Sequence, residues 1–430
     1  MIQKGDICRL KGSEMEPVDV VIGGSPCQNI SISGNGMGLD GGESKLFFEQ
    51  MRLISEMRQA GNFPKFMIWE NVSNIYACNM GCDFRSVLAE TVKVTCRQAG
   101  VAFLAGGVPK DGWKKAGALI GENWSVAWRL TNARFFGVPQ SRRRIALVAD
   151  FDGTTAPDIL FGMKPLEGKP VRPVMFRKFE NGTWNDAPGE VLKHSDYGEA
   201  PLEAREVPLT EILDPYADRE FYLTVKACEG IFKRAEKRHK TISPYLRLGM
   251  NGNIETDPRN NGLPEGVPVV VETLHHNGFG DYRAGDFSSA LKASGGDVGF
   301  GSECLVVMRF DREEGAPQYA VRRLSVTECE RAQGFPDNWT DIGAWTAPGG
   351  KFYPESPLSY RGKALGNSIA LPQWEYVLKG ILERSEHKTL GSLFDGIGGF
   401  PLIWRTLGGE AVWNSEIEPF PSCVTEVRFP

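Results

Sequence analysis

The sequence has no long hydrophobic run. Its apolar stretches, such as Val267–Val271, are far shorter than the roughly 18 residues that a membrane-spanning helix needs. The first residues, MIQKGDICRL, lack the apolar core of a secretory signal peptide. We therefore expect a cytoplasmic protein that has no membrane partner.

Cysteine is also sparse. Nine cysteines spread over 430 residues do not make the disulfide framework of a small secreted protein. Cys78 and Cys82 form the one close pair, and no histidine or second cysteine pair accompanies them as a zinc site would require. Free thiols explain this pair better, so we expect no metal.

The chain has no strong excess of charge of one sign, because 49 basic and 54 acidic residues leave a net charge of −5. This average argues weakly against a nucleic-acid partner. The basic residues are nevertheless clustered, in Lys226–Arg247 and in Ser141–Arg144. Such patches can bind a polyanion locally, although a solvated helix face explains the first patch equally well.

The first 150 residues alternate short apolar runs with helical stretches. Val18–Ile22, Lys65–Trp69 and Arg144–Ala149 read as buried strands, and Leu46–Met57 has the spacing of a helix. Strands separated by helices predict an α/β fold with a doubly wound, mostly parallel, Rossmann-like sheet. Glycine, 50 of the 430 residues, predicts many loops around it.

The alternation of strand-like and helix-like segments stops near residue 151 and returns towards the end of the chain. Residues 151 to about 320 are rich in turn residues and lack strand–helix alternation, so we expect a smaller, irregular second domain. We place domain boundaries at 1–150, 151–345 and 346–430, with the first and last segments in one catalytic domain. The last segment contains a strand, a turn, a helix and a strand: Thr389–Phe394, Asp395–Gly399, Phe400–Leu407 and Glu410–Trp413.

The C-terminal turn has the features of a cofactor site. Gly396, Gly398 and Gly399 follow a strand and open a helix, where free backbone N–H groups can receive an anion. Glu416 comes 20 residues after Gly396, a spacing that suits a carboxylate holding ribose hydroxyls. Pro401 stands where a dinucleotide site needs glycine, which favours an adenosine ligand with a carboxylate tail. A plain tight turn is the alternative.

Three further motifs lie at strand ends. Cys27 follows the first strand, where open α/β sheets place active sites, and a lowered pKa would make it a nucleophile. Glu70 follows the next strand, where a carboxyl group can move a proton. Arg142 and Arg144 alternate, so they can face one phosphate or carboxylate. An inert thiol and a capping Glu are the simpler explanations of Cys27 and Glu70.

Together, these motifs resemble the DNA cytosine-5 methyltransferase family, in its phage and prophage branch. Pro-Cys-Gln, Glu-Asn-Val and Gln-x-Arg-x-Arg resemble its fourth, sixth and eighth motifs, and Phe-Asp-Gly-Ile-Gly-Gly resembles its first. The others are found at Ser415–Glu418 (second), Gly5–Ile7 (third), Arg323–Pro336 (ninth) and Gly366–Ile369 (tenth). The family's order normally starts at the first motif. Here the chain starts at the third and ends after the second, as in a circular permutant.

The resemblance implies S-adenosyl-L-methionine as cofactor and cytosine in a specific double-stranded DNA sequence as substrate. Cys27 would attack C6 of a flipped-out cytosine, Glu70 would protonate N3, Arg144 would contact the base carbonyl and Arg142 would fix the catalytic loop. The residues implied in cofactor binding are Phe394, Asp395, Gly396, Gly398, Gly399, Glu416, Ile417, Asp6, Ile7, Asn367 and Ser368.

The loop after Cys27 resembles the family's DNA-contacting loop, and there we expect Gln28, Ser31 and Ser33 to touch DNA. Residues 151–345 would recognise the target. The family's Thr-Leu pair has its best match in Ala290-Leu291, with Thr273-Leu274 as a weaker one, so no base-reading residue is assigned. We expect a monomer and leave open a partner restriction endonuclease.

Two alternatives belong to other classes of function. A transfer-RNA cytosine-5 methyltransferase would share the architecture, but the Cys-Phe-Thr signature of that branch is missing from the sequence. A catalytically inactive DNA- or cofactor-binding module would be expected to have lost Cys27, Glu70 or the arginine pair, all of which are present.

Overall fold

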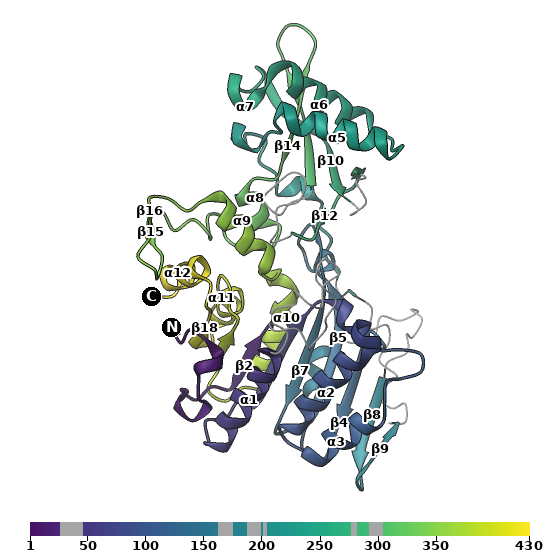
Figure 1. Ribbon diagram of the computed structural model, residues 1–430, viewed down its shortest axis with the longest axis vertical. Helices are drawn as coiled ribbons and strands as arrows, with labels where there is room; N and C mark the ends of the chain where they lie inside the picture. Colours follow the sequence, from purple (N-terminus) through teal and green to yellow (C-terminus); the bar gives the residue numbers. More distant parts are fainter. Residues whose placement is uncertain (26–45, 162–174, 187–198, 201–203, 277–281, 292–303) are drawn as a thin grey trace. The chain divides into compact units, whose positions relative to one another are not determined.

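The computed structural model describes residues 1–25, 46–161, 175–186, 199–200, 204–276, 282–291 and 304–430 (Figure 1). The chain forms two compact units. The first comprises 1–135, 143–204 and 373–430, and the second comprises 136–142 and 205–372. The first unit therefore continues past residue 150, and the three predicted domain segments stay a prediction.

One large sheet forms the centre of the first unit. Within the described residues it has ten strands, in the order β1-β18-β17-β2-β3-β7-β5-β4-β8-β9. Their bounds are β1 (Ile2–Gln3), β18 (Glu410–Ser415), β17 (Thr389–Leu393), β2 (Val20–Gly23), β3 (Phe66–Asn71), β7 (Arg143–Asp150), β5 (Ser125–Asn132), β4 (Ala116–Ile120), β8 (Met175–Glu180) and β9 (Thr183–Asp186). The first five strands in this order are all parallel to one another.

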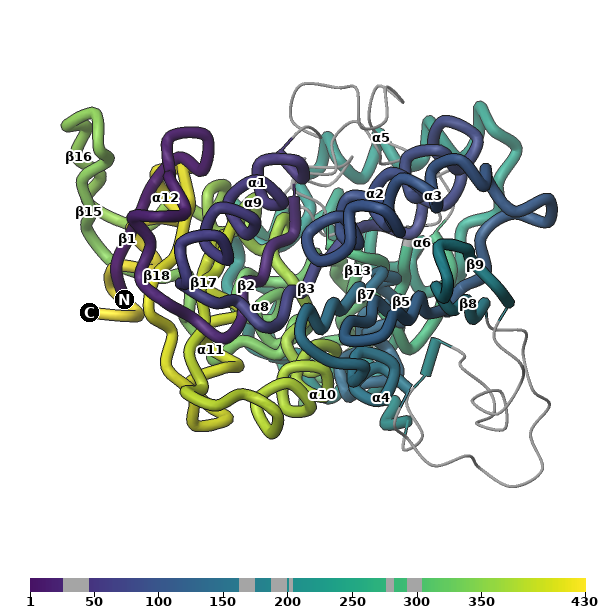
Figure 2. Tube along the Cα trace, turned by 90° about the horizontal axis from the view of Figure 1, so that it is seen from below, coloured from purple at the N-terminus to yellow at the C-terminus, as the bar shows by residue number. Residues whose placement is uncertain are grey.

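Two layers of helices cover this sheet. The helices of the first unit are α1 (Leu46–Gln59), α2 (Cys82–Lys93), α3 (Arg97–Ala105), α4 (Ala156–Phe161), α10 (Leu371–Leu382, which begins in the second unit), α11 (Gly399–Thr406) and α12 (Pro419–Arg428). Figure 2 shows α1, α2 and α3 on one face and α4, α10 and α11 on the other. The strands between them are buried on both faces, which explains their continuous apolar sequences.

The predicted mixed α/β fold is confirmed, and so are most elements on which it rested. The apolar run at Val18–Ile22 forms β2, and the C-terminal turn leads from β17 into α11. Among the strands predicted from the sequence, β7 differs in direction, because it lies antiparallel to both β3 and β5. Its run of apolar residues indicated burial but carried no information on direction.

The C-terminal strand β17 lies inside the sheet. It pairs with β18 on one side and with β2 on the other, both in parallel. The N-terminal amino group of Met1 donates a hydrogen bond to the carbonyl of Phe429 over 3.4 Å, and both ends of the chain are seen close together in Figure 1. Segments from opposite ends of the sequence therefore build the centre of one sheet.

The second unit is more regular than its turn-rich sequence predicts. Its strands β10 (Val267–His276), β11 (Tyr282–Ala284), β13 (Cys304–Asp311) and β14 (Gln318–Arg323) make an antiparallel sheet in the order β11-β10-β13-β14. Apolar side chains of α5 (Val225–Lys237) and α6 (Pro244–Thr256) share a buried core with this sheet, in which Leu246 and Val307 take part. Its other elements are α7 (Pro258–Asn261), α8 (Val326–Arg331), α9 (Leu358–Asn367), β6 (Gln140–Ser141), β12 (Ser288–Ser289), β15 (Trp345–Thr346) and β16 (Phe352–Tyr353).

A buried ion pair fixes the start of α8 to this sheet. Arg322 donates two hydrogen bonds of 2.8 Å to the carboxylate of Glu328, and neither side chain is exposed to solvent. Glu328 also accepts from the backbone N–H of Ser325, in a capping box, and from that of Asp214. The carboxylate thus joins the helix start, the last strand and a distant loop.

We expect Arg322→Met to lower the free energy of unfolding by about 3–5 kcal/mol, because it leaves a buried carboxylate without its counter-charge. The matched control is Lys233→Met, which removes the cation of an exposed pair with Glu229 in the same unit and should cost less than about 1 kcal/mol. Urea unfolding followed by tryptophan fluorescence measures both. Equal effects of the two substitutions would contradict this role of the buried pair.

Candidate functional site

The carboxyl ends of five parallel strands meet at one edge of the first unit. The register places Leu393 beside both Ser415 and Gly23, and Gly23 beside Trp69. Residues that follow these strands are therefore neighbours, whatever their separation in sequence. The candidate site consists of the turns that begin at this edge.

The glycine-rich turn after β17 adopts backbone conformations that most residues avoid. Phe394, Gly396 and Gly398 have φ angles of 53°, 57° and 78°. The value is unusual for Phe394, and strained residues of this kind are often found at functional sites. A Cβ atom at Gly398 would lie 2.4 Å from the ring of Phe429, whereas one at Gly396 would meet nothing within 4 Å. Open space therefore adjoins the turn at Gly396.

Glu416, at the end of β18, joins that strand to the glycine turn. One carboxylate oxygen accepts a hydrogen bond from the backbone N–H of Gly396 over 2.8 Å, and the other accepts from Ile417 and Glu418, also at 2.8 Å. Burial raises the pKa of Glu416, and the three N–H groups partly oppose this by stabilising the charged form. A carboxylate offers about four acceptor positions, so this side chain can still receive a hydroxyl group.

Asp395 lies beneath the turn, almost fully buried. Its carboxyl oxygens accept hydrogen bonds from the hydroxyl of Ser392 over 2.5 Å and from the amide of Asn414 over 3.1 Å. Burial raises the pKa of Asp395 to about 7, the two donors oppose the rise, and the charge of Glu416 adds to it. Asp395 therefore supports the turn from below.

The short strand β1 brings the N-terminal residues Gly5–Ile7 to this edge. The hydroxyl of Ser415 donates to the carbonyl of Gly5 over 2.5 Å, so Asp6 lies close to the end of β18. The carboxylate of Asp6 accepts from the backbone N–H of Cys8 over 3.0 Å. Ile7 is buried in the core. Any ligand contact by Ile7 would therefore be made by its backbone.

These residues fit the cofactor that the resemblance implies. Glu416 supplies a carboxylate for ribose hydroxyls, and Ile417 is an apolar side chain that is 68% exposed beside it. The open space at Gly396 lies at the entry to α11, where backbone N–H groups favour a carboxylate. The predicted group Phe394–Gly399, Glu416, Ile417 and Asp6 therefore gathers at one edge of the sheet.

Glu70 and Arg144 form an ion pair at the same edge. The Nε of Arg144 lies 2.6 Å from a carboxylate oxygen of Glu70, and both side chains are 14% exposed. The other oxygen of Glu70 would lie 2.7 Å from a Cβ atom at Gly24, so this carboxylate occupies space that only a glycine leaves open beside the backbone that leads out of β2. The sequence-predicted Cys27, Gln28, Ser31 and Ser33, which follow Gly24, lie outside the described residues.

Arg142 has a different environment from Arg144. Its guanidinium is buried and donates to three backbone carbonyls of the second unit, those of Leu291, Gly366 and Ser368. The two arginines therefore have separate partners instead of one shared anion. Arg142 fixes the turn that holds Asn367 and Ser368, at the end of α9. There Asn367 is exposed and Ser368 is buried.

The sequence alone did not single out Ser25, Trp69 and Asn71. The indole N–H of Trp69 donates to the hydroxyl of Ser25 over 3.0 Å, and the side-chain amide of Asn71 donates to the carbonyl of Ser25 over 3.2 Å. Their one signal was that they stand beside Cys27 and Glu70 in the same sequence motifs.

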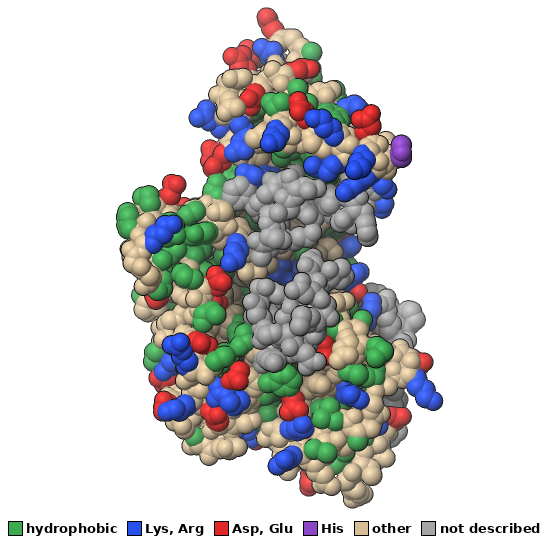
Figure 3. Space-filling view, in the orientation of Figure 1, with side chains coloured by type: hydrophobic (Ala, Val, Ile, Leu, Met, Phe, Trp, Pro, Cys, Tyr) green, Lys and Arg blue, Asp and Glu red, His purple; other side chains and the backbone are tan. Residues whose placement is uncertain are grey.

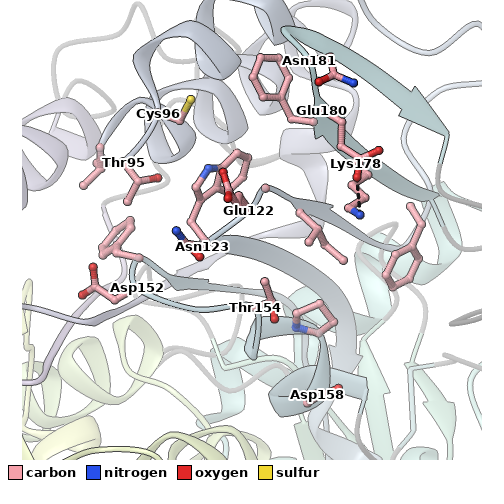
Figure 4. Close-up of a pocket in the computed structure, with 18 of the residues that line it drawn as sticks. Thr95, Cys96, Glu122, Asn123, Asp152, Thr154, Asp158, Lys178, Glu180 and Asn181 are labelled. Atoms are coloured by element: carbon pink, nitrogen blue, oxygen red, sulfur yellow. Dashed lines mark ion pairs between the residues drawn. The ribbon is translucent and has the colours of Figure 1, made fainter.

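A hollow of about 1500 Å³ lies at the opposite ends of these strands, near the start of β3 (Figure 4). It is lined by Glu122, Asp152 and Phe151, among others. The backbone N–H of Phe151 donates to Lys65, which precedes β3, whereas Glu70 stands near the end of that strand. The hollow is thus separated from the candidate site by the length of β3.

No group of three or more His, Cys, Asp or Glu side chains is arranged to hold a metal ion within the described ranges. In the same part of the chain, no helix combines the length and the apolar character that crossing a bilayer requires.

The buried Asp395 makes stability depend on pH. Its pKa of about 7 in the folded protein exceeds the value of about 4 in an unfolded chain. The folded state therefore binds the extra proton between these values, and the free energy of unfolding falls as the pH rises through this window. Asp395→Asn removes this titration, so its stability relative to the wild type should increase from about pH 5 to about pH 8.

Chemical denaturation across this pH range measures the effect. Asp337→Asn is the control, since a hydrogen bond from Arg331 lowers the pKa of Asp337 and places its titration below the window. Its stability difference from the wild type should stay constant with pH. A constant difference for Asp395→Asn as well would contradict the assigned protonation of Asp395.

Known proteins with similar sequences are methyltransferases. Residues 2–94 match the family described as C-5 cytosine-specific DNA methylase. An orphan methyltransferase of Bacillus phage SPR is 24% identical over 88% of this chain and 85% of its own length. A protein of Escherichia phage P1 named DNA N-6-adenine-methyltransferase is 25% identical over 87% of this chain, which spans only 54% of that protein.

Among solved structures, a methyltransferase of Entamoeba histolytica is similar with a TM-score of 0.40 and 10% identity, over 84% of this chain and 78% of that one. A type II methyltransferase of Staphylococcus aureus is 23% identical over 85% of this chain and 79% of its own length. The chain is therefore similar to C-5 cytosine-specific DNA methylases over residues 2–94, and to phage and type II methyltransferases over most of its length.

Proposed function

We propose that this protein transfers a methyl group to C5 of cytosine in a specific double-stranded DNA sequence. The observation that carries the proposal is the position of the Glu70–Arg144 ion pair, beside the backbone that leads to Cys27. The glycine turn and Glu416 lie at the same edge of the same sheet. An acid–base group, the approach to a nucleophile and a nucleoside-binding turn therefore adjoin one another.

In this proposal, the cofactor is S-adenosyl-L-methionine, which supplies an electrophilic methyl group when bound. Glu416 would hold the ribose, Ile417 and Phe394 would cover the adenine, and the backbone at Gly396–Gly399 would receive the methionine part. The three N–H groups already bound to Glu416 keep its carboxylate in place. Asp395 acts indirectly, by supporting the turn.

Cytosine C5 is a weak nucleophile, and covalent catalysis would overcome this by splitting the reaction into easier steps. The Cys27 thiolate would add to C6 while Glu70 gives a proton to N3, which makes C5 enamine-like. After C5 has gained the methyl group, it would lose its proton to water, the C6–sulfur bond would break to release the Cys27 thiolate, and N3 would return its proton to the Glu70 carboxylate. Arg144, paired with Glu70 in the structure, would turn toward the base carbonyl.

Arg142 would act as a positioning residue in this reaction. Its buried guanidinium binds the carbonyls of Gly366 and Ser368 and so orders the turn that carries Asn367. By the family resemblance, Asn367 and Ser368 would close the cofactor site near the methionine carboxylate, while Gln28, Ser31 and Ser33 would contact DNA.

The second unit offers a basic surface for the DNA backbone. Lys226, Lys233, Lys237, Arg238 and Lys240 are exposed along α5 and just after it. Figure 3 shows Lys and Arg side chains gathered over this part of the unit. Lysine and arginine bind phosphates without regard to sequence, which supports a polyanionic substrate even though the net charge is negative.

We further propose that the chain is a circular permutant of the usual family order. Two features support this: β17 and β18 enter the sheet between β1 and β2, and the chain ends lie within hydrogen-bond distance of each other. The exposed stretch Glu386–Lys388 would then join what are the two ends of the usual family chain.

Expression in a host without DNA methylation tests the activity. Sequencing of the host DNA should show 5-methylcytosine in one short sequence context with the wild-type chain, and background levels with Cys27→Ser, since serine is a far poorer nucleophile at C6. N6-methyladenine is measured in the same DNA, because the phage P1 relative carries that name. Methyladenine without methylcytosine would contradict the proposal.

A rearranged gene tests the permutation. A chain that starts at His387, joins Pro430 to Met1 through a short glycine linker and ends at Glu386 should fold and bind S-adenosyl-L-methionine with unchanged affinity. The control is opened between Leu390 and Gly391, inside β17, and should not fold, because it interrupts a central strand. Circular dichroism and calorimetry measure both. Failure of the first chain to fold would overturn the permutation.

A further inference from the structure

The backbone that leaves β2 is fixed by hydrogen bonds from the end of β3. Ser25 receives one on its hydroxyl, from the indole N–H of Trp69 over 3.0 Å, and another on its carbonyl, from the side-chain amide of Asn71 over 3.2 Å. Solvent reaches 3% of Ser25, none of Trp69 and 1% of Asn71. These bonds are therefore shielded from competition with water.

Trp69 has little freedom to move. Its ring packs edge-on against Phe47 of α1, with 5.5 Å between the ring centroids, and its N–H is its one polar side-chain group. A buried indole N–H that has no acceptor would lose its hydrogen bonds to water without gaining one in the protein, which is unfavourable. The ring position and the need for an acceptor together hold the hydroxyl of Ser25 in place.

The same strand also holds Glu70. Because side chains alternate along a strand, Trp69 and Asn71 point to one face of the sheet and Glu70 points to the other. The carboxylate of Glu70 nevertheless lies close to Gly24, in the space that a Cβ atom there would need. Three consecutive residues of β3 thus lie next to two consecutive residues after β2, and hydrogen bonds from Trp69 and Asn71 hold Ser25.

We propose that Trp69 is a positioning residue for the methyl-transfer reaction. Through Ser25, its indole N–H sets the distance between Glu70 and the chain that reaches Cys27 two peptide bonds later. This inference rests on the proposed function, in which Cys27 and Glu70 act on one cytosine ring. Geometry of this kind affects the rate of covalent addition more than the binding of either substrate, since addition depends on the alignment of the reacting atoms.

Trp69→Phe and Ser25→Ala test the inference, because each removes one partner of the bond and keeps most of the packing. Each should lower the single-turnover rate of methyl transfer about ten-fold, as expected for a lost hydrogen bond that orients reacting groups. Dissociation constants for S-adenosyl-L-methionine and for target DNA should stay within about two-fold of wild type. The double variant should be no slower than the slower single variant, because both remove the same bond.

Trp128→Phe is the matched control. Trp128 is also fully buried, on β5, two strands from β3, and its indole N–H donates to the carbonyl of Lys114 over 3.1 Å instead of to the backbone that leaves β2. It should cost stability but leave the single-turnover rate unchanged. Thermal unfolding checks that every variant is folded at the temperature of the rate measurement. If Trp69→Phe does not fold, Ser25→Ala still tests the same hydrogen bond.

The outcomes separate the two proposals. No methyl transfer by the wild-type chain would overturn the proposed function itself. If the wild type is active and both Trp69→Phe and Ser25→Ala transfer methyl groups as fast as the wild type, the role of Trp69 is overturned and the proposed function stands. Rate losses that multiply in the double variant, or that the Trp128→Phe control shares, would show that general stability and not the Trp69–Ser25 bond sets the rate.

Discussion

The parallel pairing of β17 with both β18 and β2 is the constraint on which the site depends. This one strand, near the end of the sequence, places the glycine turn between the end of β18 and the start of the Cys27 segment. Without it, Glu416 and Glu70 would belong to separate halves of a broken sheet. Parallel strands bring their carboxyl ends to one edge, and so the fold turns a long separation in sequence into adjacency.

The same edge concentrates buried polar groups that the fold must stabilise. Asp395 is buried and Glu416 is half-buried, and backbone N–H groups, a hydroxyl and an amide replace the lost hydration. Phe394 adds a strained backbone. A sequence optimised for stability alone would avoid these features, and their presence together fits a site in which function limits stability.

Sequence reasoning predicted the elements that have a strong local signal. The apolar run at Val18–Ile22 and the turn at Asp395–Gly399 are recognisable from their own residues, and the structure confirms the strand and the strand–turn–helix unit. Long-range facts had no such signal. The antiparallel sheet of the second unit pairs β10 with β13 across a distant stretch of chain, with a register shift between Val270 and Glu272. The hydrogen bond from Trp69 to Ser25 likewise depends on two strands that only the fold brings together.

Covalent attack by Cys27 on cytosine C6 is the central claim, and trapping the reaction midway tests it most directly. In target DNA with 5-fluorocytosine, methylation at C5 leaves no proton to remove, so the enzyme should stay bonded to the base. Digestion and mass spectrometry of this complex should find one nucleotide adduct, on the peptide that contains Cys27. An adduct on any other cysteine, or methyl transfer without an adduct, would contradict the account.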